Sequence, residues 1–157
     1  MEAGHLSGAA VDVFPEEPKT VGDPFTSCLQ GIPNVILTPH IGGSTQEAQE
    51  DIGRFVAGKL RDYVAAGNTS MSVNLPPVAT DRGDRTRILH VHQNVPGVLA
   101  TVNGVLADSR VNIEGQTLST RGELGYVITD VSGPLAEEAV AKLSDLPETV
   151  RLRVIAG

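Results

Sequence analysis

His40 occupies a position at which a protein can move a proton. It follows the strand-like run NVILTP, residues 34–39, and precedes a pair of glycines and a helix start. In open α/β sheets, ligands commonly bind at the carboxyl ends of strands, and a histidine there can pass a proton near neutral pH. The loop DVFPEEP supplies Glu16 and Glu17 as carboxylate partners. The alternative is a structural histidine in a turn with solvent-facing glutamates, because spacing does not show contact.

A second group of polar residues lies further along the chain. His90, His92 and Asn94 fall at alternate positions of one predicted strand, so they share a face. Pro96 and Gly97 then open a helix, whose free N–H groups suit a small carboxylate. This arrangement predicts a site for an amino acid or a hydroxy acid.

Two other interpretations of the histidine pair stay open. His90 and His92 form a His-x-His motif that could bind a metal, although no third ligand accompanies it in the sequence. They could equally lie on a solvated or dimer-facing strand that binds no ligand.

The second half of the chain supplies the strand that carries these histidines. Alternating and helical hydrophobic patterns follow one another in the order β-α-β-β-α-β. This is the split arrangement of a ferredoxin-like antiparallel sheet with two helices on one face. The other face has no helix to cover it, so we expect two copies to associate. The predicted elements are RILHVHQ, GVLATVNGVLADS, VNIEGQTLST, GYVITDVS, LAEEAVAKLSDL and TVRLRVIA.

The first half is predicted to be an incomplete α/β segment. Its strand candidates, GAAVDVF and NVILTP, are nearly continuous apolar runs, which are typical of a sheet covered on both faces. Ser44 and Glu47 form a capping box at the start of an amphipathic helix. Two strands and one helix cannot bury one another's apolar surface, so we expect this half to be poorly ordered or to pack against another chain.

A polar stretch separates the two halves. Residues 68–84 contain two adjacent prolines and no helical or alternating pattern, which indicates a linker. The predicted organisation is an incomplete α/β segment at 1–67, the linker at 68–84 and a ferredoxin-like βαββαβ domain at 85–157. The predicted fold class is therefore α+β.

Composition argues against several classes of partner. A formal net charge of −7 and an aromatic content of 3% disfavour binding to nucleic acid. No apolar run approaches the roughly 20 residues needed to cross a membrane, and the first residues lack the pattern of a secretory signal. The single Cys28 fits a reducing compartment. We therefore expect a cytoplasmic protein with no membrane partner.

Three separated stretches resemble one enzyme family. They are similar, in the same order, to the C-terminal part of the D-3-phosphoglycerate dehydrogenases, which are 2-hydroxy-acid dehydrogenases, in the form that ends in an ACT regulatory domain. The resemblance covers nearly the whole chain. It implies that residues 1–67 are a remnant of the Rossmann-type dehydrogenase domain and its return helix, and that 85–157 form the ACT domain. The stretches are GAAVDVFPEEP, DPFTSCLQGIPNVILTPHIGGSTQEAQEDIG and HVHQNVPGVLATVNGVLADSRVNIEGQTLSTRGELGYVITDV.

The resemblance also implies roles for individual residues in the first half. In the family, the histidine of the TPHIGG motif, here His40, is the catalytic acid/base. The second glutamate of PEEP, here Glu17, supports that histidine. The aspartate of the DVF motif, here Asp12, lies beside the nicotinamide of NAD.

In the second half, the resemblance implies a regulatory site. The family binds L-serine across a dimer interface with the residues that correspond to His92, Asn94 and Asn112. The end product of the pathway thereby inhibits its first committed enzyme. We therefore expect a homodimer through the ACT domain with L-serine as its allosteric ligand, although these side chains could also accept glycine.

The chain departs from the family in what it lacks. It has no G-x-G-x-x-G after a strand, and it lacks the upstream arginine with which the family holds the substrate carboxylate. We therefore expect this chain alone neither to bind NAD nor to catalyse the dehydrogenase reaction. The alternative function is a non-enzymatic, amino-acid-sensing ACT module that pairs with a full-length enzyme or another partner.

Overall fold

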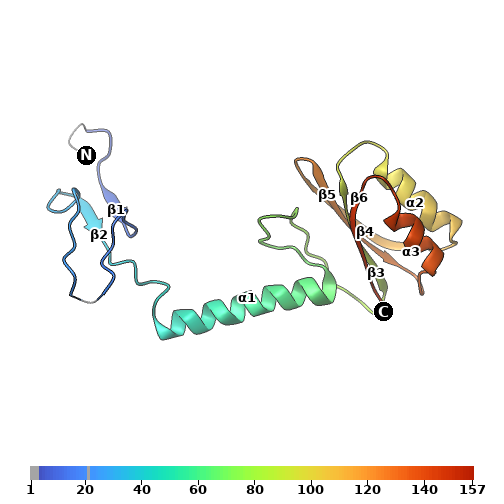
Figure 1. The fold of residues 1–157 in the computed structure, drawn as a ribbon, viewed down its shortest axis with the longest axis horizontal. Helices are drawn as coiled ribbons and strands as arrows, with labels where there is room; N and C mark the ends of the chain where they lie inside the picture. Colours follow the sequence, from blue (N-terminus) through green and yellow to red (C-terminus); the bar gives the residue numbers. More distant parts are fainter. Residues whose placement is uncertain (1–3, 21) are drawn as a thin grey trace. The chain divides into compact units, whose positions relative to one another are not determined.

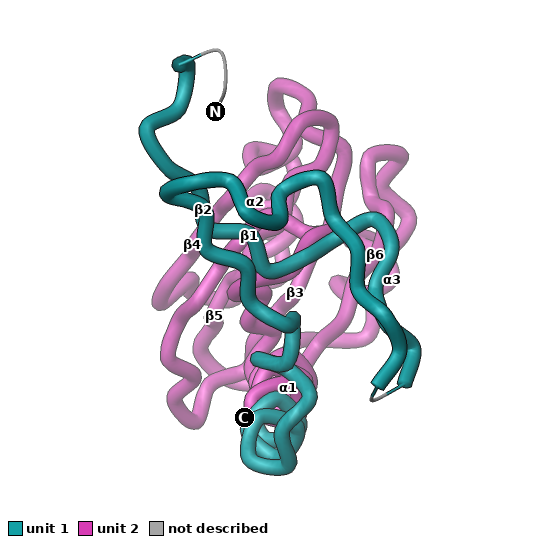
Figure 2. Tube along the Cα trace, turned by 90° about the vertical axis from the view of Figure 1, so that its left-hand side faces the viewer, with its two compact units in different colours: residues 1–54 teal, residues 55–157 magenta. Residues whose placement is uncertain are grey.

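The computed structural model describes residues 4–20 and 22–157 and divides into two compact units (Figure 2). Unit 1 comprises residues 1–54 and unit 2 residues 55–157. No helix in the described part of the chain is both long enough and apolar enough to cross a membrane. The elements, labelled in Figure 1, are β1 (Ala9–Val11), β2 (Val35–Leu37), α1 (Gln46–Ala66), β3 (Thr86–Gln93), α2 (Val98–Asp108), β4 (Ile113–Arg121), β5 (Leu124–Val131), α3 (Glu137–Ser144) and β6 (Thr149–Ile155).

Unit 1 is built on one short parallel strand pair. Strands β1 and β2 pair in the register Ala9 with Val35, Ala10 with Ile36 and Val11 with Leu37. No residue among 4–20 and 22–54 is buried, and the Ile36 side chain is 64% exposed. The apolar strands therefore lack the covering layers that their sequences predict.

Unit 2 is a four-stranded antiparallel sheet with two helices. The strand order is β4-β5-β3-β6, and the chain order is β-α-β-β-α-β. Helices α2 and α3 lie on the same side of the sheet (Figure 1). The predicted ferredoxin-like fold of this half is confirmed.

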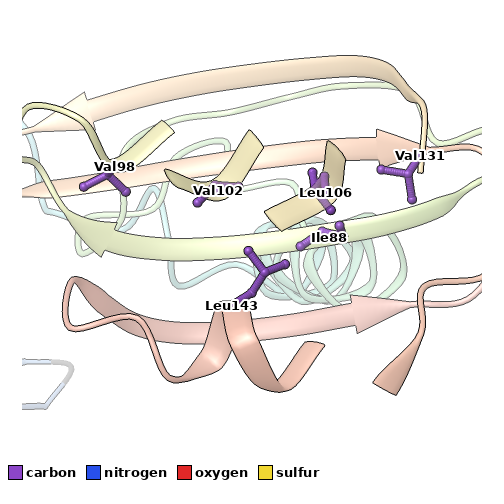
Figure 3. Packing of buried hydrophobic residues seen from close by; sticks show 6 residues of the cluster. All are labelled: Ile88, Val98, Val102, Leu106, Val131 and Leu143. Carbon is purple, nitrogen blue, oxygen red and sulfur yellow. The ribbon is translucent and has the colours of Figure 1, made fainter. Parts of the chain in front are cut away.

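One core lies between the helices and the sheet. Side chains alternate between the two faces of a strand, and the even-numbered residues of β3, such as Ile88, lie on the face that packs against the helices. Closely packed, fully buried aliphatic side chains from helices and strands give this unit its hydrophobic stabilisation. The six residues of the cluster, shown in Figure 3, are Ile88, Val98, Val102, Leu106, Val131 and Leu143.

The second face of the sheet is covered in part by residues 68–84, which the sequence pattern marks as a linker. Val78 of this segment is buried against Leu89 and Ile128 of the sheet. Its backbone N–H donates to Thr69 Oγ1 at 2.8 Å, which fixes the segment as a closed loop. The open apolar face expected from the sequence is therefore partly covered by its own chain, and this weakens that reason for expecting two copies to associate there.

Side chains of unit 2 complete the C-terminal end of α1. Arg87 is fully buried; it donates to Ala66 O at 2.9 Å and, through Nε and Nη2, to the Asp130 carboxylate at 2.6 and 2.7 Å. The Tyr126 hydroxyl donates to Gly67 O at 2.6 Å. The last carbonyls of a helix have no partner within it, so these bonds fix the end of α1 to the sheet.

Candidate functional site

The structure brings His40 and Glu17 together at the end of the strand pair. His40 Nδ1 lies 2.9 Å from both carboxylate oxygens of Glu17. A carboxylate accepts hydrogen bonds, so Nδ1 carries the proton and Nε2 remains as the basic nitrogen. Of the two carboxylates that the sequence offers, it is therefore Glu17 and not Glu16 that contacts the histidine. Both side chains border a cavity of about 860 Å³ that is also lined by Phe14 and Thr38.

The contact between these residues changes the protonation of both. The hydrogen bond to Glu17, and then the charge of Glu17, raises the pKa of His40. The backbone N–H of Phe14, 2.9 Å from Glu17 Oε1, lowers the pKa of Glu17, and the bond to His40 lowers it further. An ion pair that borders a cavity is an arrangement that can hold and release a proton near neutral pH.

Asp12 joins the same cluster from the end of β1. Its Oδ1 accepts hydrogen bonds from Thr38 Oγ1 at 2.5 Å and from the backbone N–H of His40 at 3.1 Å. The Thr38 hydroxyl is the main reason why the pKa of Asp12 is lowered, followed by the His40 N–H among the groups that lower it. The sequence patterns did not single out Thr38. The strand register could have done so, since Val11 pairs with Leu37 and the next residues are therefore neighbours.

In unit 2, His90 and His92 lie side by side on the helix-covered face of β3. Both are buried, and their ring centroids are 5.3 Å apart. His90 Nε2 lies 2.8 Å from Thr149 Oγ1, whose hydroxyl donates to Leu143 O at 2.7 Å. The single hydroxyl proton is used in that second bond, so Nε2 of His90 must be the donor. Burial, and then the neighbouring His92, lowers the pKa of His90 to about 4.

His92 is fixed by the backbone around it. Its Nδ1 lies 2.8 Å from Gln93 O, which can only accept, so the neutral ring keeps a lone pair on Nε2. That Nε2 is buried and has no partner among the described residues. A Cβ at Gly125 would lie 2.2 Å from His92 Cε1, so only glycine at position 125 leaves room for the ring.

The two asparagines of the predicted serine set lie at opposite ends of the sheet. Asn94 follows β3 and donates through Nδ2 to Gly122 O at 3.1 Å. Asn112 precedes β4, and its backbone carbonyl accepts from the N–H of Ser132 at 3.0 Å. From Gly125, the partner of His92, to the end of β5 is six steps, or about 20 Å at about 3.3 Å per residue. Within one chain, Asn112 is therefore not brought to His92 and Asn94.

Other charged residues prove structural where the sequence offered no role. Arg153, on the last strand, donates to Tyr63 O at 3.5 Å and to Val64 O. Together with Arg87 it binds the end of α1, a long-range contact that a strand pattern cannot show. The described residues bring no third histidine, cysteine or carboxylate to His90 and His92 that would complete a metal site.

Comparisons with known proteins agree with this division into two parts. Residues 88–151 match the family described as the AHAS small subunit-like ACT domain. Residues 1–42 match the NAD-binding domain of the D-isomer specific 2-hydroxyacid dehydrogenases. The chain thus joins a piece of a dehydrogenase fold to a ferredoxin-like regulatory module of the ACT class.

Similar full-length proteins identify the family. D-3-phosphoglycerate dehydrogenase of Escherichia coli (strain K12) is 49% identical over 153 residues, which are 96% of this chain and 37% of that protein. The proteins of the same name from Dictyostelium discoideum and Haemophilus influenzae are each 46% identical over 156 residues, covering 99% of this chain and 38% of each relative. The chain belongs to the D-3-phosphoglycerate dehydrogenase family, as its motifs predict, and spans less than two-fifths of these relatives' length.

Proposed function

We propose that this chain is the C-terminal part of a D-3-phosphoglycerate dehydrogenase, an NAD-dependent enzyme of serine biosynthesis, and that it carries one corner of the active site and an L-serine-binding ACT domain. The observation that carries the catalytic half is the bond of His40 Nδ1 to the Glu17 carboxylate at 2.9 Å. A cytoplasmic location fits an enzyme of this kind with one exposed, free cysteine, Cys28.

His40 is the acid/base of the proposed reaction. When the 2-hydroxyl of 3-phosphoglycerate is oxidised, its O–H proton passes to His40 Nε2 while hydride leaves the carbon. Glu17 holds the tautomer that leaves Nε2 basic, and its negative charge stabilises the imidazolium that forms. The bond to Glu17, and then the charge of Glu17, raises the pKa of His40 and so makes it a stronger base for this transfer.

The residues present fit one end of NAD. Bound NAD supplies the hydride acceptor through its nicotinamide. Asp12 stands next to His40, and its Oδ1 is occupied by Thr38 and the His40 N–H. The second carboxylate oxygen, which has no partner among the described residues, suits the amide donor of a nicotinamide. We propose Asp12 as the residue of this chain nearest the cofactor, and we expect the chain alone not to retain NAD.

His92 and Asn94 form half of the proposed L-serine site. His92 Nε2 offers a lone pair to a donor on the ligand, and the N-terminus of α2 offers N–H groups to its carboxylate. Asn112 lies about 20 Å away in the same chain, at the spacing of six strand residues. The site is therefore complete only when Asn112 comes from a second copy, which requires an ACT-mediated homodimer.

Calorimetric titration of L-serine into the chain tests the regulatory half. We expect saturable binding that Asn94→Ala and Asn112→Ala each abolish, while the exposed Asn74→Ala, outside the site, binds normally. Mixing the two inactive variants and allowing their subunits to exchange should restore about a quarter of the sites, because only a mixed dimer contains one intact pair. Loss of binding without restoration would contradict a shared site, and no binding by the folded chain would remove the serine assignment.

The second candidate is an amino-acid sensor without catalysis, and it is favoured by the completeness of unit 2 beside the coreless unit 1. Incubation of the chain with NAD and 3-phosphoglycerate tests whether the chain catalyses the reaction by itself. We expect no steady turnover by the chain alone. Turnover that His40→Gln abolishes would show that the chain is itself the enzyme.

A further inference from the structure

The backbone of His40 is held in an unusual conformation. Its φ angle is +50°, in the left-handed region. A residue with a Cβ atom seldom adopts this conformation, and it persists where surrounding groups hold it in place. His40 is followed by Ile41 and a glycine pair, so the strain falls on the histidine although more permissive residues are close by.

One carboxylate oxygen holds this conformation. Asp12 Oδ1 accepts from the backbone N–H of His40 at 3.1 Å and from the hydroxyl of Thr38 at 2.5 Å. The last ladder bond of the strand pair, from Thr38 N to Val11 O at 3.0 Å, lies directly before it. The Asp12 carboxylate therefore extends the pairing of the two strands by one more step, at the point where β2 turns into the left-handed residue.

The same loop also fixes the partner of the His40 ring. Glu17 accepts from the backbone N–H of Phe14 at 2.9 Å, so its carboxylate is tied to the chain just beyond β1. With its backbone turned as observed, the ring of His40 lies within 2.9 Å of both Glu17 oxygens. Two carboxylates of one segment thus bind different parts of His40: Asp12 binds its backbone N–H, and Glu17 binds its ring.

We infer that Asp12 is a positioning residue for His40: its carboxylate holds the left-handed backbone that aims the imidazole at Glu17. This role rests on the proposed acid/base function of His40 and is separate from any contact of Asp12 with a cofactor. It also makes Thr38 part of the same device, because its hydroxyl fixes the orientation of the Asp12 carboxylate.

Charge is the competing explanation, because a carboxylate close to His40 would favour the imidazolium wherever the backbone lay. Two substitutions separate geometry from charge. Asp12→Asn keeps an oxygen that can accept from the His40 N–H and the Thr38 hydroxyl but removes the charge. Asp12→Ala removes both. Thr38→Val removes only the hydroxyl that orients the carboxylate.

The experiment is an NMR titration of the His40 ring in the full chain, with its Nδ1–H signal and its pKa as the measured quantities. Glu17→Gln should shift the His40 pKa toward the value of an exposed histidine. Asp12→Ala should cause the same shift, and combining it with Glu17→Gln should change the His40 pKa no further. Asp12→Asn should retain the Nδ1–H signal and most of the raised pKa. Thr38→Val should fall between these two. His90 and His92 serve as internal signals that unit 2 is intact.

Each remaining outcome decides one point. An unchanged pKa in Asp12→Ala, or equal shifts in Asp12→Ala and Asp12→Asn, would overturn the positioning role and leave the His40–Glu17 pair standing. No shift in Glu17→Gln would instead remove that pair and with it the proposed catalytic function. An ordinary His40 pKa with no Nδ1–H signal in the unaltered chain would overturn both.

Discussion

Unit 1 and unit 2 differ in the interactions that stabilise each of them internally. In unit 2, buried aliphatic side chains form clusters on both faces of the sheet, including Leu143 and Val102 on one face and Ile128 on the other. In unit 1, no described residue is buried, and its conformation depends on one short strand pair and on side-chain carboxylates that bind backbone N–H groups. The groups suited to proton transfer thus lie in the part with the least hydrophobic stabilisation. The buried core and the candidate proton-transfer residues therefore lie in separate segments of one chain.

The largest expected difference between the units is in their resistance to protease. Limited trypsin digestion, followed by mass spectrometry, should cleave the Lys19–Thr20 bond at least on the order of a thousand-fold faster than the Arg87–Ile88 bond. The reason is that unit 1 opens at little cost in free energy, whereas β3 is exposed only when the whole core of unit 2 opens, at about 5 kcal/mol or more. Similar cleavage rates at the two bonds would mean that unit 1 is covered in solution by another copy or partner.

The next effect concerns the buried ion pair of unit 2. Asp130→Ala leaves the guanidinium of the fully buried Arg87 without its partner and should lower the free energy of unfolding by about 3–5 kcal/mol. Glu114→Ala, which removes the partly exposed partner of Arg85, is the matched control and should cost less than about 1 kcal/mol. Urea unfolding followed by circular dichroism measures both. Equal losses would show that the bonds that Arg87 already makes to the carbonyls of Ala66 and Asp81 are enough to satisfy its guanidinium.

The sequence was sufficient to predict the βαββαβ domain at 85–157 because its hydrophobic patterns are local. The alternation of RILHVHQ and the helical spacing of GVLATVNGVLADS each specify one face, and the faces meet in the observed core. The pattern failed where a charged residue is paired far away in the chain. Arg87 lies on the linker-covered face at the start of β3, and its partner Asp130 stands 43 residues on. Nothing local distinguishes such an arginine from one at the surface.

The candidate site divides in the same way between what is local and what is not. Residue type and the family motifs predicted His40 and Glu17, and the structure brings these two together. They did not predict the left-handed backbone of His40 or the bond from Thr38 to Asp12, which depend on strand register. The polar segment 68–84 resembles a linker in composition, yet buried residues within it cover the sheet, because packing depends on partners that composition does not reveal.

A third prediction uses the buried histidine to probe unit 2 alone. Burial lowers the pKa of His90 to about 4, so the folded state stays neutral there while the unfolded state takes up a proton near pH 6.5. Unfolding therefore binds a proton between these pH values, and stability should fall by up to about 3 kcal/mol as the pH drops from about 6.5 to about 4.

His90→Gln keeps a donor for Thr149 and does not titrate, so its unfolding free energy should lose less over the same pH range. Urea unfolding at several pH values gives the difference between the two proteins, in which the common contribution of the carboxylates cancels. Parallel pH profiles would mean that His90 is accessible to protons in the folded state, and that unit 2 is less tightly closed around its histidines than its burial indicates.

The smallest expected effect lies in the apolar strand of unit 1. Ile36→Ala removes a side chain that is 64% exposed, so the rate of trypsin cleavage at Lys19 should change by less than about two-fold, equivalent to less than about 0.5 kcal/mol. This substitution tests whether the apolar surface of β2 is truly uncovered in solution. A truncation cost like that of a core residue, about 2 kcal/mol or more, would require atoms packed around Ile36 that one chain does not supply. In that case unit 1 would lack buried residues only in the isolated chain. In solution, the strand pair around His40 would be stabilised by a second copy or a partner that packs on Ile36.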